Sequence, residues 1–242
     1  MDTVATMSPA TAAGWDLGAM YGAIAELLLN PEVREAERVE RHLAKLPPTP
    51  VRERVERFMA STAAYDVNEY TQTLELTPPC PLYLGAHMYD EPGSCRGAGA
   101  CGRNQYMIEL KAMYEHFGFS LEEVELPDFL PVMLEFLSVS IALPERDGIG
   151  LRRRFVEQYL QPGIPHLRKS MQKYESVYDL LLEALELVAE EDMERLADDP
   201  IWLAPEVKAT IPVQIGTSNG TGAADPMAAA HPVPEHRLSG VW

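Results

Sequence analysis

The chain has 242 residues, 46% of them hydrophobic, which is enough for one domain with a sizeable core. Its 37 acidic and 20 basic side chains give a formal charge of −17, which repels phosphate backbones and argues against nucleic acid as a partner. No stretch reaches the roughly 20 consecutive apolar residues of a membrane-spanning helix.

The N-terminus and the cysteines indicate the cellular compartment of the protein. The N-terminal segment lacks the basic region that opens a secretory signal. Cys80, Cys95 and Cys101 are too few and of the wrong parity for a disulfide framework, which agrees with a reducing compartment. We therefore expect a cytoplasmic protein.

Apolar residues recur at three- and four-residue spacing through most of the chain, which predicts amphipathic helices. The first is expected at 20–28 and the third at 50–62. Between them, the polar segment 31–46 predicts a second helix with Pro31 in its first turn, where a ring nitrogen is tolerated.

The second half of the chain continues this pattern. Four more helices are expected at 104–119, 151–161, 164–174 and 176–191. Gly118 is expected to stop the first of these. Ser176 and Asp179 have the spacing of a capping box, with Asp in place of the usual Glu, and would open the last one.

The segment 125–138, ELPDFLPVMLEFLS, carries two prolines and two acids at the start of an apolar run. Asp128 is expected to cap a helix here by accepting hydrogen bonds from amides two or three positions on. Pro131 would be the third helical residue, where a missing N–H costs little, and Pro127 would hold the incoming chain extended. Glu125 lies outside this helix and has no obvious local role.

Strand signals are missing from the sequence. No run alternates with a period of two, and no Asn-Gly or Asp-Gly pair separates β-branched runs. We expect an all-α fold, a single compact bundle of about eight or nine helices. Its expected limits are 16–197, preceded by a flexible arm at 1–15 and followed by a Pro-, Gly- and Ala-rich tail at 198–242 that is largely disordered.

Segments 69–89 and 125–138 carry a family resemblance. ELPDFLPVMLEFLS resembles the Glu-x-Pro-Asp entrance and Leu-Pro-x-x-Leu-Glu-Phe-Leu helix of the redox-enzyme maturation chaperones, the NarJ, TorD and DmsD type. EYTQTLELTPPCPLYLGAHMY is similar to a segment of the nitrate reductase delta-subunit branch of that family. SVYDLLLEAL, within 176–191, is a weaker match to the family's last helix.

This resemblance implies a TorD-like helical fold and a chaperone that is not an enzyme and needs no cofactor. Members bind the apo catalytic subunit of a molybdopterin oxidoreductase, often at its N-terminal peptide. They hold it until the molybdenum cofactor and iron–sulfur clusters are in place, and then leave. By the family pattern, the residues expected to contact the client peptide or to shape its site are Tyr83, Glu125, Pro127, Asp128 and Glu135.

The chain departs from the family pattern at two places. Pro81 stands where the branch usually has Ser, and the linker 90–103 is longer and richer in Gly and Cys. The sequence therefore does not decide which enzyme is the client. It can be nitrate reductase or a related enzyme of the selenate, chlorate, perchlorate, dimethylsulfide or ethylbenzene type. Monomeric and domain-swapped dimeric states also both remain open.

Two other functions compete with the chaperone. Cys95 and Cys101 could serve a thiol- or metal-dependent enzyme, but their five-residue separation matches no strong zinc pattern. If 80–89 were one helix, Cys80 and His87 would lie about 10 Å apart along its axis and could not share one ion. The second alternative is a permanent subunit of the oxidoreductase.

Overall fold

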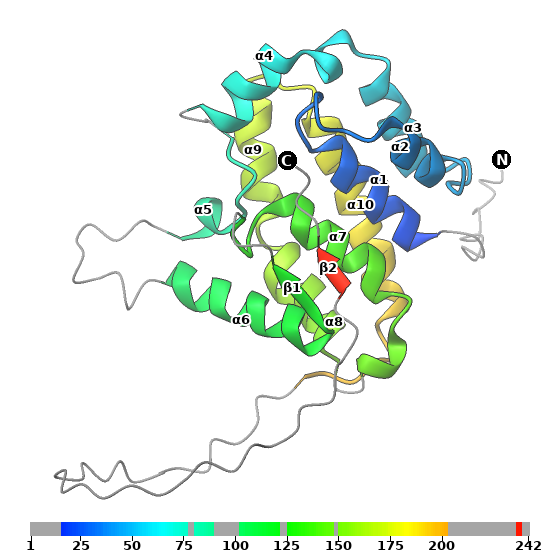
Figure 1. The fold of residues 1–242 in the computed structure, drawn as a ribbon, viewed down its shortest axis with the longest axis vertical. Coiled ribbons are helices and arrows are strands. Elements are labelled where there is room, and N and C mark those ends of the chain that lie inside the picture. The colour runs from blue at the N-terminus through cyan, green and yellow to red at the C-terminus, as the bar shows by residue number, and fades with distance from the viewer. Residues whose placement is uncertain are drawn as a thin grey trace, which may run out of the picture.

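The computed structural model describes residues 16–76, 80–89, 102–121, 125–147, 150–202 and 236–238 (Figure 1). Its first half contains α1 (Leu17–Leu27), α2 (Ala36–Leu43), α3 (Pro50–Met59), η1 (Thr62–Tyr65), α4 (Val67–Tyr70), η2 (Thr71–Glu75), α5 (Gly85–Met88) and α6 (Gly102–His116). Its second half contains β1 (Phe119–Leu121), α7 (Leu130–Ser140), η4 (Pro144–Arg146), α8 (Leu151–Arg154), η5 (Phe155–Leu160), α9 (Ile164–Lys173), α10 (Asp179–Arg195) and β2 (His236–Leu238).

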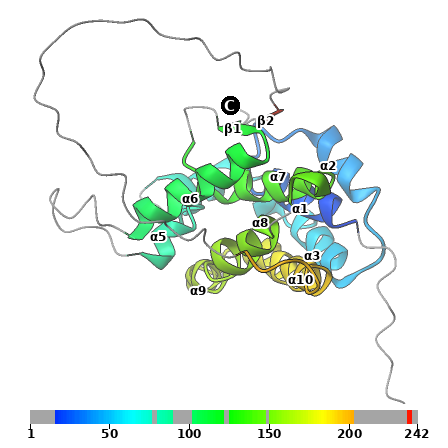
Figure 2. The same cartoon turned by 90° about the horizontal axis from the view of Figure 1, so that it is seen from below.

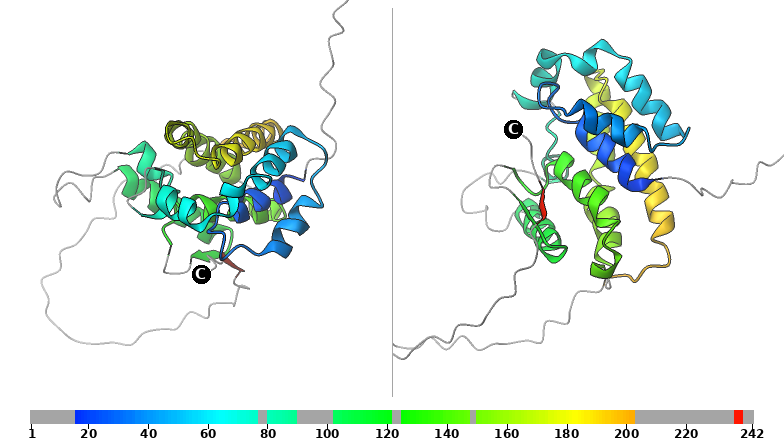
Figure 3. Two further views of the ribbon diagram at one scale, coloured as in Figure 1. Left: turned by 90° about the horizontal axis from the view of Figure 1, so that it is seen from above. Right: turned by 45° about the vertical axis from the view of Figure 1, so that its right-hand side comes forward.

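The expected all-α bundle is confirmed. Helix α1 lies in the middle of it and packs against α2, α7 and α10, while α10 also packs against α3 and α9 (Figures 1 and 2). Helices α9 and α10 form one side of the molecule, and the short β1–β2 pair lies on the opposite side (Figure 3). Within the described residues, no helix combines the length and the apolar character needed to span a membrane.

Helices α1 and α7 are antiparallel and form the centre of the core. At one end, the Ser138 hydroxyl donates a hydrogen bond to the Gly18 carbonyl at 2.7 Å. At the other end, Glu26 and Pro131 line the same small hollow. A Cβ on Gly18 would lie 2.9 Å from the Ser138 carbonyl oxygen, so the close approach of the two helices requires glycine there.

Several of the expected helices are confirmed. Helix α3 begins at Pro50 with the Thr49 hydroxyl accepting a bond from the Arg52 amide at 3.3 Å. Helix α6 ends before Gly118, whose φ of +82° is the left-handed conformation that glycine adopts without strain. The predicted helices at 151–161 and 164–174 are also present, the first as α8 followed by the π-helical η5.

Helix α2 begins later than predicted. Pro31 lies in a turn in which the Asn30 side chain accepts a bond from the Glu32 amide at 3.1 Å. The Glu35 amide then donates to the Glu26 carboxylate at 2.7 Å, and Glu26 is buried in α1. The start of α2 is therefore set by a contact with α1 and not by the proline.

The capping box predicted for the last helix is wrong. The Ser176 hydroxyl accepts from the Tyr178 amide at 3.3 Å, and α10 begins only at Asp179. The Asp179 carboxylate accepts instead from Arg168 of α9 at 2.9 Å. Both groups of the expected box thus have other partners.

The β1–β2 pair was not predicted. It is parallel, and Ser120 stands opposite Arg237 in the register. Three residues are too few for an alternating pattern to be visible in the sequence. The arm expected at 1–15 and most of the tail expected at 198–242 lie outside the described residues, so those boundaries stay predictions.

Candidate functional site

The two longest family-like segments lie side by side. Tyr83 and Phe129 form an isolated antiparallel bridge. The Leu84 amide donates to the Asp128 carbonyl at 2.9 Å, and the Leu130 amide donates to the Leu82 carbonyl at 2.8 Å. The entrance of α7 is thereby fixed to the 80–89 segment by backbone hydrogen bonds.

Tyr83 and Glu125 form the accessible part of this junction. The Tyr83 hydroxyl donates a hydrogen bond to the Glu125 carboxylate at 3.0 Å, and the Tyr83 ring lies against Phe129 with a centroid distance of 5.2 Å. Leu126 beside them is 44% exposed. A partly buried acid, a tyrosine and an exposed leucine thus lie next to one another.

Burial changes the acid–base behaviour of this pair. It raises the pKa of the Glu125 carboxyl, against the opposing effect of the Tyr83 hydrogen bond. Burial, and then the Glu125 charge, raise the pKa of Tyr83 to about 12. At neutral pH, Tyr83 is therefore a neutral donor and Glu125 a carboxylate that has lost part of its hydration.

Asp128 does not cap α7, and that prediction is wrong. The N-cap position is Phe129, and the described structure gives α7 no side-chain cap. The Asp128 carboxylate is fully buried, and its Oδ2 accepts from Arg103 Nε at 3.0 Å. Its Oδ1 has no hydrogen-bond partner among the described residues. Gly85 packs on this ion pair, because a Cβ there would lie 2.7 Å from Asp128 Oδ2.

Pro127 is also buried, so its ring is not part of the accessible surface of this junction. Its carbonyl accepts a hydrogen bond from the Tyr114 hydroxyl at 2.8 Å. Pro131 is in the first turn of α7, as expected. The loop that precedes α7 is therefore held by Arg103 and Tyr114, which both belong to α6.

Glu135 lies apart from Tyr83 and Glu125. It projects from α7 into the hollow shared with α1 and α2, where it binds Arg38 at 2.9 Å. Arg38 also lies 3.4 Å from the Glu26 carboxylate. Burial raises the pKa of Glu135, and the Arg38 contact opposes that rise. Phe129 connects the two places, because it lines this hollow and also packs on Tyr83.

The possible metal ligands are not gathered in the described part of the chain. Cys80 is buried with a free thiol, and burial raises its pKa to about 11. His87 Nε2 lies 2.7 Å from the Pro81 carbonyl oxygen, and α5 covers only Gly85–Met88, so 80–89 is not one helix. The described residues contain no group of three or more His, Cys, Asp or Glu able to hold a metal. Cys95 and Cys101 lie outside them.

Arg103 and Arg38 were missed by the sequence analysis. Arg103 is the last residue of the Cys- and Gly-rich linker and lies 25 positions from Asp128. Arg38 is one of two arginines on α2 and lies 97 positions from Glu135. No local spacing pattern connects either arginine with its acid.

Comparisons with known proteins indicate the family of this chain. A sequence model described as nitrate reductase delta subunit matches residues 48–169, which include all five predicted site residues. The probable nitrate reductase molybdenum cofactor assembly chaperone NarJ of Bacillus subtilis is 30% identical over 139 residues, 56% of this chain and 67% of that protein. The nitrate reductase molybdenum cofactor assembly chaperone NarJ of Escherichia coli K12 is 31% identical over 153 residues, 58% of this chain and 59% of that protein.

Proposed function

The chain belongs to the nitrate reductase delta subunit family, and on that basis we propose that it is an assembly chaperone for a molybdopterin oxidoreductase. It binds the apo catalytic subunit, or the N-terminal peptide of that subunit, in the cytoplasm. It holds the subunit while molybdenum cofactor and iron–sulfur clusters are inserted, and it is not part of the mature enzyme. It performs no catalysis and carries no cofactor of its own.

The observation that carries this proposal is the junction of Tyr83, Glu125 and Leu126. Glu125 offers a carboxylate to a cationic side chain of the client. Leu126 and the Tyr83 ring offer apolar surface beside it. A peptide with a basic residue next to apolar ones fits such a surface, because charge and apolar contact are satisfied at neighbouring points.

Rigidity of the loop supports the same proposal. The Tyr83–Phe129 bridge and the Arg103–Asp128 ion pair hold the loop from both sides before any client arrives. A surface that is already ordered loses less conformational entropy on binding. The formal charge of −17 adds a long-range attraction for a basic segment.

The proposal is tested by maturation of the client in the native host. Deletion of the gene is expected to leave the catalytic subunit synthesised but depleted in molybdenum and iron, both measured per polypeptide by elemental analysis. Restoring the chain in trans is expected to restore both metals. A fully loaded catalytic subunit in the deletion strain would contradict the proposal.

The same preparations separate the competing functions. The purified mature oxidoreductase is expected to lack this chain, whereas a permanent subunit would be present in stoichiometric amount. Replacing Cys95 and Cys101 by Ser is expected to leave client loading intact. Loss of loading together with loss of a bound metal would favour the thiol- or metal-dependent enzyme.

A further inference from the structure

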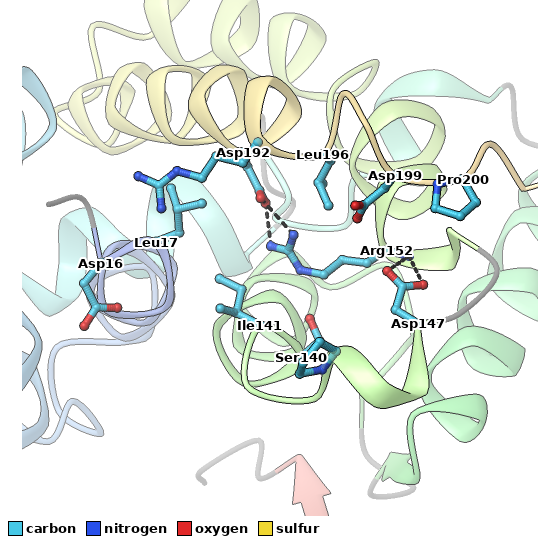
Figure 4. A pocket seen from close by; sticks show the side chains of 12 residues that line it. Asp16, Leu17, Ser140, Ile141, Asp147, Arg152, Asp192, Leu196, Asp199 and Pro200 are labelled. Carbon is cyan, nitrogen blue, oxygen red and sulfur yellow. Dashed lines mark hydrogen bonds and ion pairs between the residues drawn. The ribbon is translucent and has the colours of Figure 1, made fainter. Parts of the chain in front are cut away.

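A second cavity lies at the opposite end of the α1–α7 pair from Tyr83 and Glu125. It is lined by the start of α1, the end of α7, α8 and the end of α10 (Figure 4), and its volume is about 450 Å³. That volume falls in the range of about 300–1,000 Å³ that is typical of small-ligand sites. Helix α7 has 11 residues, which places the cavity about 16 Å along its axis from the loop 125–129, here called the client-peptide loop.

The floor of this cavity is a neutralised ion pair. Arg152 extends from α8 across the cavity to Asp192 of α10 (Figure 4), and its Nη1 lies 2.8 Å from Asp192 Oδ1. The Tyr21 hydroxyl donates to Asp192 Oδ2 at 2.9 Å. Arg195, at the rim, pairs with Glu191 at 2.8 Å. The basic side chains of the cavity are therefore already matched by acids.

The remaining charges of the cavity are negative. The Asp147 carboxylate accepts bonds from the Arg152 amide at 3.1 and 3.3 Å but pairs with no cationic side chain in the described structure. Asp199 has no hydrogen bond or ion pair through its carboxylate among those residues. Burial raises the pKa of Asp147, its backbone bonds and the Arg152 charge oppose that rise, and the Asp199 charge adds to it. Neither carboxylate thus forms an ion pair in the described structure, although the Arg152 charge acts on Asp147 and Arg153 donates to the Asp199 carbonyl oxygen at 2.8 Å.

The apolar walls of the cavity and its hydrogen-bond donors indicate which class of ligand fits it. Leu17, Ile141 and Leu196 give it apolar walls. Its acids do not form a metal site among the described residues, which favours an extended organic cation over a bare ion. Arg152 is 6% exposed, and its Nε–H has no acceptor among the described residues. An occupant that also carries a carbonyl group would supply that acceptor.

We propose that this cavity binds a guanidinium or ammonium group on an apolar stem, with the cation between Asp147 and Asp199. A basic side chain of a peptide and a small free amine share this chemistry. The cavity is separate from the client-peptide loop. If the cavity did not bind a cation, the proposed chaperone function would therefore be unaffected.

The test is calorimetric titration of the full chain with butylguanidinium and with butylurea, its neutral analogue of similar shape. Butylguanidinium is expected to bind at one site, at least about tenfold more tightly than butylurea, because charge-assisted bonds to carboxylates are strong. Equal binding of the two compounds, or no binding of either, would overturn the proposal.

Single substitutions test whether the cation binds in this cavity. Asp199→Asn is expected to weaken butylguanidinium about tenfold, whereas Glu157→Gln removes the same charge from an exposed position and is expected to change nothing. Every titration here, with small cations or with peptides, uses the Glu125→Gln background, because Glu125 is itself proposed to bind a cationic side chain beside apolar surface. If Asp199→Asn bound as tightly as Glu157→Gln, the proposal would be wrong.

A second pair of probes identifies the source of the cation. The peptide acetyl-Leu-Arg-Leu-amide is compared with the same peptide carrying citrulline, which has the shape of arginine without its charge. Tighter binding of the arginine peptide than of butylguanidinium supports a peptide occupant. Binding of butylguanidinium alone supports a small free organic cation as the occupant.

Discussion

The carboxylate of Asp128 lies 3.0 Å from the Nε of Arg103, and the carboxylate is wholly buried whereas Arg103 keeps 20% of its side chain exposed. Loss of one partner is therefore expected to cost more stability than loss of the other. Without Asp128, the guanidinium can still turn toward water. Without Arg103, a buried negative charge has no partner, which is the more costly state.

We expect Arg103→Met to lower the free energy of unfolding by about 3 kcal/mol. Asp128→Asn, which keeps the shape of the side chain, is expected to cost about 1 kcal/mol. Urea denaturation of both variants measures the difference. Arg57→Met, at an exposed arginine of α3, is the control and is expected to change stability by less than about 0.5 kcal/mol. A larger loss for Asp128→Asn than for Arg103→Met would contradict this account.

Glu125→Gln is expected to weaken binding of the client's N-terminal peptide while slightly stabilising the fold. The folded-state pKa of Glu125 is raised, so its ionised form opposes folding, and that penalty appears as the pH rises through the folded pKa. The variant should gain up to about 0.5 kcal/mol at pH 7. This gain should vanish below the ordinary glutamate pKa of about 4.3.

Thermal melts at pH 7 and pH 4, beside a peptide titration at pH 7, check the Glu125 prediction. Tyr83→Phe removes the hydroxyl donor, and Tyr65→Phe at an exposed tyrosine is its control. Peptide binding by Glu125→Gln that equals the wild type would remove Glu125 from the site.

Arg168→Met is expected to destabilise the α9–α10 contact in a salt-dependent way. Arg168 binds Asp179 at 2.9 Å, Glu183 at 3.0 Å and Glu186 at 2.5 Å, and the Asp179 bond is the main cause of its raised pKa. Removal of Arg168 leaves three carboxylates close together. It should lower the free energy of unfolding by about 1 kcal/mol in dilute buffer.

In 1 M NaCl the screening length falls to about 3 Å, so most of the loss in Arg168→Met should disappear. Guanidinium chloride would mask this effect, so urea is the denaturant of choice. Lys169→Met on the exposed face of α9 is the matched control. A loss that is the same at both salt concentrations would mean that packing, and not charge, is what Arg168 contributes.

His42→Leu is expected to remove part of the acid sensitivity of the fold. The ring packs on Gly22 of α1, and its Nδ1 is buried without a partner among the described residues. Burial, then the charge of Arg38, lowers the folded-state pKa of His42. The stability linked to neutral His42 is present above the ordinary histidine pKa of about 6.5 and is lost as the pH falls through the folded value.

Urea denaturation at pH 7.5 and pH 5.5 measures this dependence on His42. The wild type should lose more stability between the two values than His42→Leu, because the other titrating groups are the same in both chains. An equal loss would show that His42 does not contribute to the pH dependence.

The helices were predictable where their signals are local. Thr49 with Pro50 marks the start of α3, and Gly118 marks the end of α6, because a hydroxyl cap and a left-handed φ act on adjacent residues. The start of α2 was not predictable from Pro31, since a buried carboxylate of another helix fixes it.

The two incorrect caps share one physical cause. Asp128 and Asp179 each stand where a local rule expects an acid to cap a helix, and in each case an arginine of another helix binds the carboxylate. A guanidinium offers a charged donor, which outcompetes backbone amides. Which arginine arrives depends on the packing of the whole bundle, and no spacing in the sequence reports that.

The candidate site was predictable only as a pair of segments. The family resemblance pointed to Tyr83 and Glu125, but the contact between them follows from the backbone bridge at Phe129. Glu135 carries the same kind of charge yet faces α1 and α2, because it lies farther along α7. Glu125 lies in the loop before α7, whereas Glu135 lies on the helix itself.

The Tyr83–Phe129 bridge has a consequence for retargeting such a chaperone. Its hydrogen bonds join main-chain atoms, so they persist when the outward side chains are exchanged. We therefore expect that Tyr83, Glu125 and Leu126, the residues of the proposed client site, can be exchanged for those of a relative while the main-chain scaffold beneath them is kept. Divergence of clients within a lineage would need few coordinated changes.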